Sequence, residues 1–170
     1  MNGNDWEKEL LYQFSKKDKS RKRAYICSPL SAESSDGIVK NMRCARGYMY
    51  YAMKKMNLYA GAPHAYLPML LFDQVPAERA IGLQFGLRLL EQSDMLFVCG
   101  SQLSEGMRSE IAYAAKLKMP IVAFDEDLYL EVQKEVNKAG QNKRLVKLDR
   151  DHYPMSFTSI IKYIENSTAF

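Results

Sequence analysis

The stretch from Ser93 to Ala115, SDMLFVCGSQLSEGMRSEIAYAA, limits the possible folds of this chain more than any other part of it. Residues 95–99 are apolar without alternation, which is the pattern of a parallel strand covered on both faces. A polar turn follows, and Ser104 stands where a helix N-cap belongs. The helix that it begins repeats apolar residues at helical spacing. A buried strand therefore leads directly into a helix that packs on the sheet.

Glu110 is the most informative polar residue on this helix. It lies about 60° from Met107 around the helix axis, at the edge of the apolar stripe. A carboxylate held there is a candidate nucleophile or general base, because partial burial raises its basicity. The structural alternative is an ordinary helix glutamate that pairs with a surface cation such as Arg108 or Lys116.

The first turn of the same helix, Ser104-Glu105-Gly106-Met107, is suited to holding an anion. Its backbone amides are free, the helix dipole favours negative charge, and the Ser104 hydroxyl adds a donor. Gly106 costs the helix up to ~1 kcal/mol relative to alanine, and close approach of a ligand to the backbone would justify that cost. The alternative is an N-cap serine followed by a glycine that is needed for packing.

Strands and helices alternate along the rest of the chain. Besides the strand at 95–99 and its helix, apolar runs predict strands at 24–27, 58–62, 121–124 and 144–148, and periodicity predicts helices at 37–56, 76–92, 128–139 and 157–165. Alternation of this kind implies right-handed βαβ units around a parallel sheet. We therefore expect an α/β fold, a three-layer sandwich with a five-stranded parallel sheet of the flavodoxin-like or Rossmann-like type.

In such a sheet, ligands bind outside the carboxyl ends of the strands, near the point where the strand order reverses. This rule gathers Ser28, His64, residues 100–104 and Asp125 at one edge. His64 follows Pro63 at a strand end, so it is a candidate for contacting a ligand or relaying a proton. A structural histidine that only forms hydrogen bonds within its own loop explains the sequence equally well.

Composition excludes several classes of protein. The 170 residues fit one domain, and 47% hydrophobic with 26% charged residues is typical of a globular protein. No apolar run approaches a membrane span and the first residues lack a signal-peptide core, so we expect a cytoplasmic protein with no membrane partner. The three cysteines fit no metal or disulfide spacing, and we interpret Cys27 and Cys99 as small buried hydrophobes. Neither a GxGxxG motif nor a P-loop is present, and we expect no cofactor and no metal.

The net charge of +4 comes from one short segment. Residues 16–23, KKDKSRKR, carry six Lys or Arg and one Asp, so the remainder of the chain has a net charge of −1. We interpret this segment as a solvated linker rather than a site for nucleic acid. Residues 4–15 can form a short amphipathic helix ahead of it. The predicted organisation is an N-terminal helix and basic linker at 1–22, followed by an α/β domain at 23–170.

Three features together resemble the nucleoside 2-deoxyribosyltransferase family. They are Tyr25-Ile26-Cys27-Ser28 on the first strand, Asp94 opening the third, and Ser104-x-Gly106-x-x-x-Glu110 leading into the helix. The resemblance covers roughly residues 23–125. With Ala62-Pro63-His64 and Glu78-Arg79, the chain is most similar to an uncharacterised bacterial and phage branch of that superfamily.

The resemblance implies a mechanism. In that family, the glutamate matching Glu110 attacks the anomeric carbon of a nucleoside, and water or a second base then completes hydrolysis or transfer. Tyr25 matches a tyrosine that positions this glutamate. A serine at the position of Ser104 is similar to the branch that hydrolyses nucleoside 5'-monophosphates and binds their phosphate there. Ser28, His64 and Asp94 are expected to line the same site, and a homo-oligomer is expected because the family completes its sites across subunits.

One position departs from the family. Eight residues before Asp94 the family has an aspartate that helps to protonate the departing base, and this chain has Gly86. Another donor, such as His64 or Asp73, is then needed. We therefore expect a nucleotide-binding N-glycosidase-like protein, or alternatively a non-catalytic binder that senses or sequesters a nucleotide-derived signal. Nucleic-acid binding through residues 16–23 is the third hypothesis.

Overall fold

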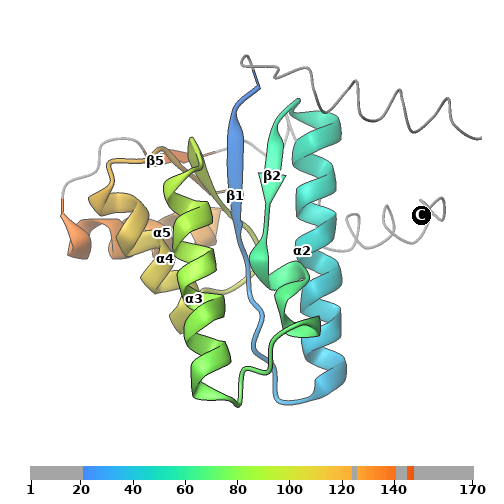
Figure 1. Cartoon of the computed structure of the whole chain (residues 1–170). Coiled ribbons are helices and arrows are strands. Elements are labelled where there is room, and N and C mark those ends of the chain that lie inside the picture. The colour runs from blue at the N-terminus through green and yellow to red at the C-terminus, as the bar shows by residue number, and fades with distance from the viewer. Residues whose placement is uncertain (1–20, 124–125, 141–144, 148–170) are drawn as a thin grey trace, which may run out of the picture.

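The computed structural model describes residues 21–123, 126–140 and 145–147, which form a parallel sheet covered by helices (Figure 1). The strand order is β2-β1-β3-β4-β5, and every neighbouring pair is parallel. The expectation of an α/β fold with a parallel sheet is confirmed. The strands are β1 (Arg23–Cys27), β2 (Tyr59–Gly61), β3 (Met95–Val98), β4 (Ile121–Ala123) and β5 (Leu145–Lys147).

The helices begin and end close to the predicted positions. They are α2 (Ser35–Lys55), α3 (Pro76–Glu91), α4 (Glu105–Lys116) and α5 (Glu126–Ala139). Between β2 and α3 the chain forms two short 3-10 helices, η1 (Pro63–Ala65) and η2 (Leu67–Met69), each with a proline in its first two positions.

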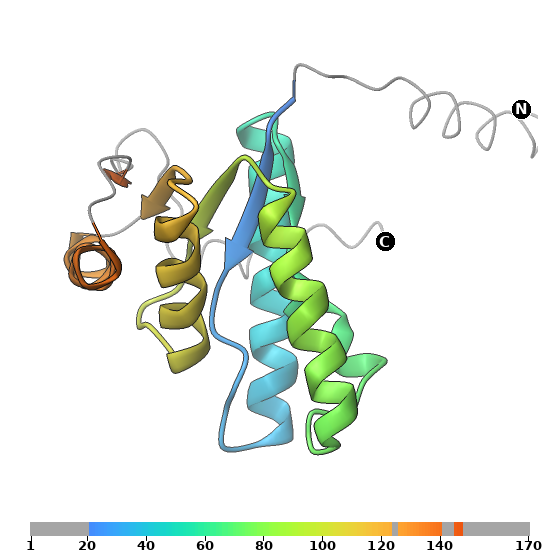
Figure 2. The same cartoon turned by 60° about the vertical axis from the view of Figure 1, so that its left-hand side comes forward.

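Alternation along β1 divides the core between the two faces of the sheet. Tyr25 and Cys27 point to the face that α3, α4 and α5 cover, where they join Met107 and Ile111 in one apolar cluster. Ala24 and Ile26 point to the opposite face and pack in the cluster that includes residues of α2. Figure 2 shows α2 behind the sheet and the other helices in front of it. A side chain on β1 therefore reaches the α4 side only from alternate positions.

The reversal of strand order lies at β1, which pairs with β2 on one side and β3 on the other. The loops that follow β1 and β3 meet at the carboxyl edge. Gly100 has a φ of +107°, and a Cβ added to it would lie 2.9 Å from Cδ of Pro29. Both conditions favour glycine, so Gly100 allows the two loops to approach each other beside the site described below.

Several expected features lie outside the described residues: the helix at 4–15, most of the basic segment, Asp125 and the helix at 157–165. The last residues of the basic segment are described, and the Arg21 guanidinium lies over the Tyr59 ring at 4.6 Å from its centroid. Among the helices that the structure describes, none combines the length and apolar character needed to cross a membrane.

Candidate functional site

The site is organised around a hydrogen bond between β1 and α4. The Tyr25 hydroxyl donates to Oε1 of Glu110 over 2.6 Å, joining residues 85 positions apart. Tyr25 is 2% exposed and Glu110 is half-buried. Burial, followed by the nearby Glu110 carboxylate, raises the pKa of Tyr25 well above its usual value, so the phenol stays protonated and donates. The structure thus brings together the two residues that the sequence singled out.

The environment of the Glu110 carboxyl group favours its protonated form. Burial raises the pKa of Glu110, while hydrogen bonds from Tyr25 and from the Cys27 thiol lower it and only partly oppose that effect. Cys27 is fully buried and its thiol also lies 3.9 Å from the Met107 carbonyl oxygen. A carboxylate that is basic for its type, but held in place by the Tyr25 hydroxyl, is suited to act as a nucleophile or base.

We expect Tyr25→Phe to raise the pKa of Glu110 further, because the variant loses a hydrogen bond that stabilises the carboxylate. Titration of the ¹³C-labelled Glu110 carboxyl group by NMR measures the shift. Tyr48→Phe is the matched control, because Tyr48 is also a buried tyrosine but packs in the cluster on the opposite face of the sheet. An unchanged or lowered Glu110 pKa in Tyr25→Phe would contradict the assigned hydrogen bond.

Two further residues lie at this site. The sequence assigns Cys27 only a packing role and does not identify Tyr66. The expectation that Cys27 is a buried hydrophobe is correct, but its free thiol also lies near enough to Glu110 to lower the pKa of that carboxyl group. Tyr66, in the turn between η1 and η2, lies close enough to Tyr25 to raise the pKa of its phenol. No local motif marks Tyr66, because tertiary packing of η1 against α2 and α3 brings it there.

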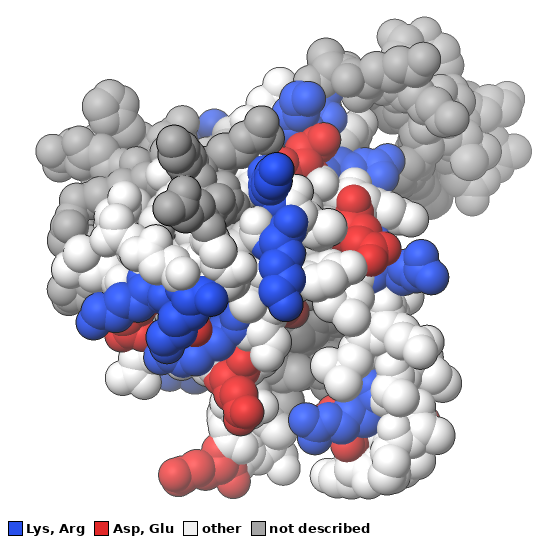
Figure 3. Space-filling model, turned by 90° about the vertical axis from the view of Figure 1, so that its left-hand side faces the viewer, with Lys and Arg blue, Asp and Glu red and all other residues white. Residues whose placement is uncertain are grey.

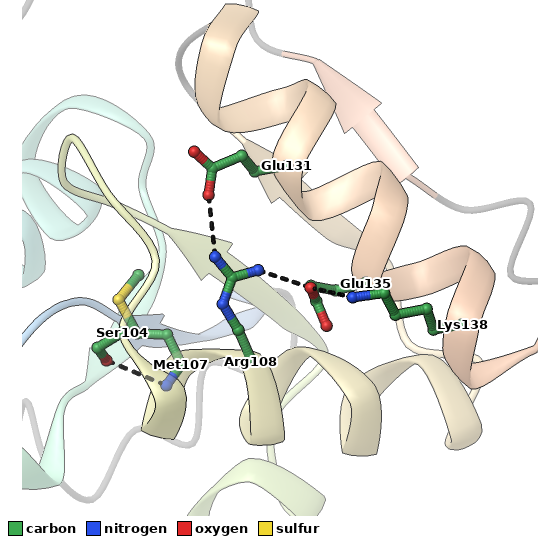
Figure 4. A network of polar contacts seen from close by, with 6 residues as sticks. All are labelled: Ser104, Met107, Arg108, Glu131, Glu135 and Lys138. Atoms are coloured by element: carbon green, nitrogen blue, oxygen red, sulfur yellow. Dashed lines mark hydrogen bonds and ion pairs between the residues drawn. The ribbon is translucent and has the colours of Figure 1, made fainter.

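Ser104 is the N-cap of α4, as predicted, and its Oγ accepts a 3.3 Å hydrogen bond from the Met107 amide (Figure 4). The hydroxyl hydrogen remains able to donate to an anion. A Cβ added to Gly106 would meet no atom closer than Oγ of Ser104 at 4.0 Å, so Gly106 is not required for packing among the described residues. Its two chain neighbours aside, no other side chain of the described residues lies within 4 Å of the position that a Cβ of Gly106 would take.

Of the first-turn residues expected to bind an anion, Met107 does not direct its side chain to the site. Its side chain is 2% exposed and packs in the core between α4 and the sheet. Its amide is already bonded to Ser104. The helical stripe that made Met107 an apolar core position also explains why its side chain is directed away from the open first turn.

Arg108 does not pair with Glu110. This excludes Arg108 as the surface cation in the structural alternative for Glu110. Its guanidinium contacts Glu135 at 2.6 Å and Glu131 at 3.3 Å, and Lys138 adds a 3.0 Å contact to Glu135 (Figure 4). Hydrogen bonds, first from Lys138 and also from Arg108, lower the pKa of Glu135. This network joins α4 to α5 and leaves Glu110 bonded to Tyr25 and Cys27.

Ser28 and His64 meet at the carboxyl edge, as the strand-end rule predicted. Ser28 Oγ lies 2.7 Å from Nε2 of His64. Ser28 is 5% exposed, and burial lowers the pKa of His64 to about 4, so the imidazole is neutral at pH 7. The hydroxyl also lines a cavity of about 190 Å³ between α2 and the loops after β1 and β3, together with Pro29, Ala32, Tyr48, Gly100 and Ser101.

Gly86 lies directly beside the Glu110 site. A Cβ added to this residue of α3 would be 3.5 Å from the Tyr25 hydroxyl oxygen and 4.0 Å from Cγ of Pro63. Both are ordinary contact distances, so the position has room for a side chain directed at the tyrosine. Gly86, the position at which the resembling family carries an acid, therefore lies beside Tyr25 but has no acidic group.

Asp94 lies at the opposite edge of the sheet and does not join the site. It precedes β3, and its Oδ2 accepts a 2.8 Å hydrogen bond from the Arg23 amide at the start of β1. A residue that opens a parallel strand is at the amino edge, whereas Ser28 and Ser104 follow strands. We therefore correct the expectation that Asp94 contacts a ligand at this site.

Glu78 and Arg79 support the segment that leads into α3 instead of pairing with each other. Glu78 accepts a 2.6 Å hydrogen bond from the Phe72 amide, and Arg79 forms an exposed ion pair with Asp73 at 3.6 Å. Asp73 is thus tied to a surface cation. Within the described part of the chain, no group of three or more His, Cys, Asp or Glu is arranged to hold a metal ion.

The fold and the site together define a parallel α/β protein with a hydrogen-bonded Glu–Tyr pair beside the reversal of strand order. Residues 22–124 match the family described as Domain of unknown function (DUF7768), and the chain belongs to that family. Its structure is similar to that of a 2-deoxyribosyltransferase from the psychrotolerant bacterium Bacillus psychrosaccharolyticus, described as a biocatalyst for the industrial synthesis of antiviral and antitumoral nucleosides.

That likeness has a TM-score of 0.53 at 15% sequence identity and covers 81% of this chain and 95% of the other. At this identity it establishes a shared fold. Among curated proteins, none matches this chain.

Proposed function

We propose that this protein is a nucleotide-binding N-glycosidase that cleaves or transfers the base of a nucleoside 5'-monophosphate, with Glu110 as the nucleophile. The observation that carries the proposal is the Glu110 carboxyl group, whose pKa burial raises and which Tyr25 and Cys27 hold beside the reversal of strand order. The fold shared with a 2-deoxyribosyltransferase and the sequence resemblance to that family support the same chemistry.

In the proposed reaction, an oxygen of Glu110 attacks the anomeric carbon while the bond to the base nitrogen breaks and its electron pair leaves with the base. Tyr25 keeps the attacking oxygen in place. The resulting ester is then attacked by water, which releases the sugar phosphate, or by a second base, which completes a transfer. A carboxylate suits this reaction because it stabilises the oxocarbenium-like transition state before it bonds to it.

The open first turn of α4 is the proposed phosphate site. The Ser104 hydroxyl still has a hydrogen to donate, and Gly106 allows close approach to the backbone. We expect the wild-type protein to release free base from one or more nucleoside 5'-monophosphates faster than from the matching nucleosides, as measured by chromatography. Ser104→Ala is expected to raise KM for the monophosphate by about tenfold and to leave the nucleoside almost unaffected. Equal loss on both substrates would contradict a phosphate role.

A non-catalytic binder is the second candidate, and Gly86 is the observation that favours it. Without a general acid beside Tyr25, the departing base loses assistance that is typically worth ~10²–10⁴ in rate. The site formed by Glu110 and the first turn of α4 would then hold a nucleotide-derived molecule without cleaving it. Tight binding of a monophosphate by calorimetry, with no base released from any substrate, distinguishes this function from the first.

We further propose that the protein works as a homo-oligomer through the outer surface of α3 and the segment before it. Helix α3 buries only Leu90, and the lower right of Figure 3 is mostly white apart from one cluster of charged side chains. Such a surface is larger than isolated exposed apolar residues explain. Its exposed apolar residues are Met69, Leu70, Phe72, Val75, Ile81, Leu83, Phe85 and Leu87.

We expect light scattering to give a mass that is a multiple of 19.5 kDa for the wild-type protein and a lower mass for Phe85→Glu, because a carboxylate at the centre of an apolar interface is strongly unfavourable. Leu130→Glu on α5 is the matched control: Leu130 is 46% exposed, compared with 45% for Phe85, and lies outside this surface. A monomeric wild type, or equal effects of both variants, would contradict the assignment.

A further inference from the structure

The Ser28–His64 pair is not used by the reaction outlined above. Its two members follow neighbouring strands, Ser28 directly after β1 and His64 within η1 after β2, and they are 36 positions apart. Pro63 begins η1 and fixes the backbone that carries the imidazole. The 2.7 Å contact therefore joins two segments that follow neighbouring strands of the sheet.

The pair is next to both parts of the candidate site. On one side, Ser28 lines the cavity of about 190 Å³, which is smaller than the ~300 Å³ of drug-sized pockets and suits a single ring system better than a whole nucleotide. On the other side, Ser28 follows Cys27, whose thiol bonds to Glu110. Pro63, which precedes His64, lies 4.0 Å from the position that a Cβ of Gly86 would take beside Tyr25.

The protonation state of His64 limits what the pair can do. A neutral imidazole carries one N–H, and when that hydrogen is on Nε2 it donates to Ser28 Oγ. The Ser28 hydroxyl hydrogen is then free to donate to a ligand. A neutral histidine behind a buried serine is a poor proton donor by itself, but it orients the serine hydroxyl as a hydrogen-bond donor.

We propose that Ser28, oriented by His64, donates the hydrogen bond that stabilises the departing base, in place of the acid that is absent at Gly86. This inference rests on the proposed N-glycosidase function. As the bond from the anomeric carbon to the base nitrogen breaks, the electron pair remains on the base, and Ser28 donates to an acceptor atom of its ring or carbonyl. The base then takes its proton from water. Ser28 contacts the substrate, and His64 is a positioning residue.

The test compares nucleoside 5'-monophosphates whose bases differ in acidity. We expect Ser28→Ala to lower kcat about 10²-fold for the least acidic base and less than about threefold for the most acidic, because a good leaving group needs little stabilisation. His64→Gln should show the same trend with a smaller loss. Ser93→Ala is the control and should show no trend, because Ser93 is a half-buried serine at the amino edge of the sheet whose Oγ donates to the Leu89 carbonyl oxygen over 2.7 Å. A loss of equal size for all bases, or no loss, overturns the proposal.

A binding measurement separates this proposal from the proposed function. Free adenine, guanine, cytosine, thymine and uracil are each titrated into ¹⁵N-histidine-labelled protein, and the His64 imidazole is followed by NMR. We expect at least one base to shift the His64 Nε2 resonance in the wild type, with binding at least tenfold weaker in Ser28→Ala. A shift without any base release from nucleotides would refute the glycosidase function but retain the contact of Ser28 with the base. No shift with any base overturns the contact itself.

Discussion

Glu110→Gln is expected to lower the rate of base release at least ~10³-fold, because the amide oxygen has almost the same shape but cannot form the ester intermediate. The Tyr25 hydroxyl can still donate to the amide oxygen, so the local structure should be preserved. Chromatography of free base from the best monophosphate, with wild type and variant at equal concentration, measures the loss. Retained activity in this variant would exclude the nucleophile and with it the proposed mechanism.

The matched control for this variant is Glu105→Gln. Glu105 is also a glutamate on α4, but it is exposed in the first turn. We expect it to retain activity within a few-fold of wild type. Comparable losses in both variants would show that the negative charge of α4, rather than the Glu110 carboxylate itself, is responsible for the effect.

The Glu110→Gln variant should also be more stable than the wild type at neutral pH. The pKa of Glu110 is raised in the folded protein, so the unfolded state loses the carboxyl proton at a lower pH than the folded state does. The free energy of unfolding therefore falls as the pH rises from the pKa of the unfolded state to that of the folded state. Glu110→Gln removes this penalty, and we expect Tm at pH 7 to be higher for the variant than for the wild type. The difference should shrink toward about pH 4, where the wild-type carboxyl group is protonated. A lower Tm for the variant at pH 7 would contradict the raised pKa.

Gly86→Asp is expected to increase base release about 10²-fold, because it places a carboxyl group beside the Glu110 site. The contacts of 3.5 Å to the Tyr25 hydroxyl and 4.0 Å to Pro63 leave room for the new Cβ. Two carboxyl groups at close range do not both ionise readily, so one of them keeps a proton near neutral pH and can serve as an acid. If the wild type is a binder, this substitution is the one expected to give turnover.

Two further variants make this prediction specific. Gly86→Asn has a similar size but no acidic proton, and it should give no comparable gain. Gly82→Asp introduces the same carboxyl group one turn earlier on α3, where an added Cβ would meet Cδ1 of Leu71 at 3.6 Å and no group of the site. A gain with Asn as large as with Asp would indicate a packing effect rather than proton donation.

Much of the fold follows from local sequence rules. The unbroken apolar run before Gly100, the N-cap at Ser104 and the proline at the start of α3 each act over a few residues, so they predict elements whose bounds agree within a few residues with the structure. Strand direction also fixes which residues lie at the carboxyl edge. The same rule places Asp94, which precedes β3, at the amino edge. The family resemblance predicted a ligand contact for Asp94, and the strand direction contradicts that prediction.

The sequence by itself determined the α/β alternation, the start of α4 and the choice of Glu110 as a candidate, because these depend on periodicity and short spacings. Only the tertiary structure decided the state of that carboxyl group. Its hydrogen-bond partner Tyr25 comes from a strand 85 positions away in the sequence, and Arg108, close to it in sequence, is held by α5 instead. Burial and hydrogen bonding between distant segments set the pKa of a side chain, and neither is encoded in the spacing of residues along one helix.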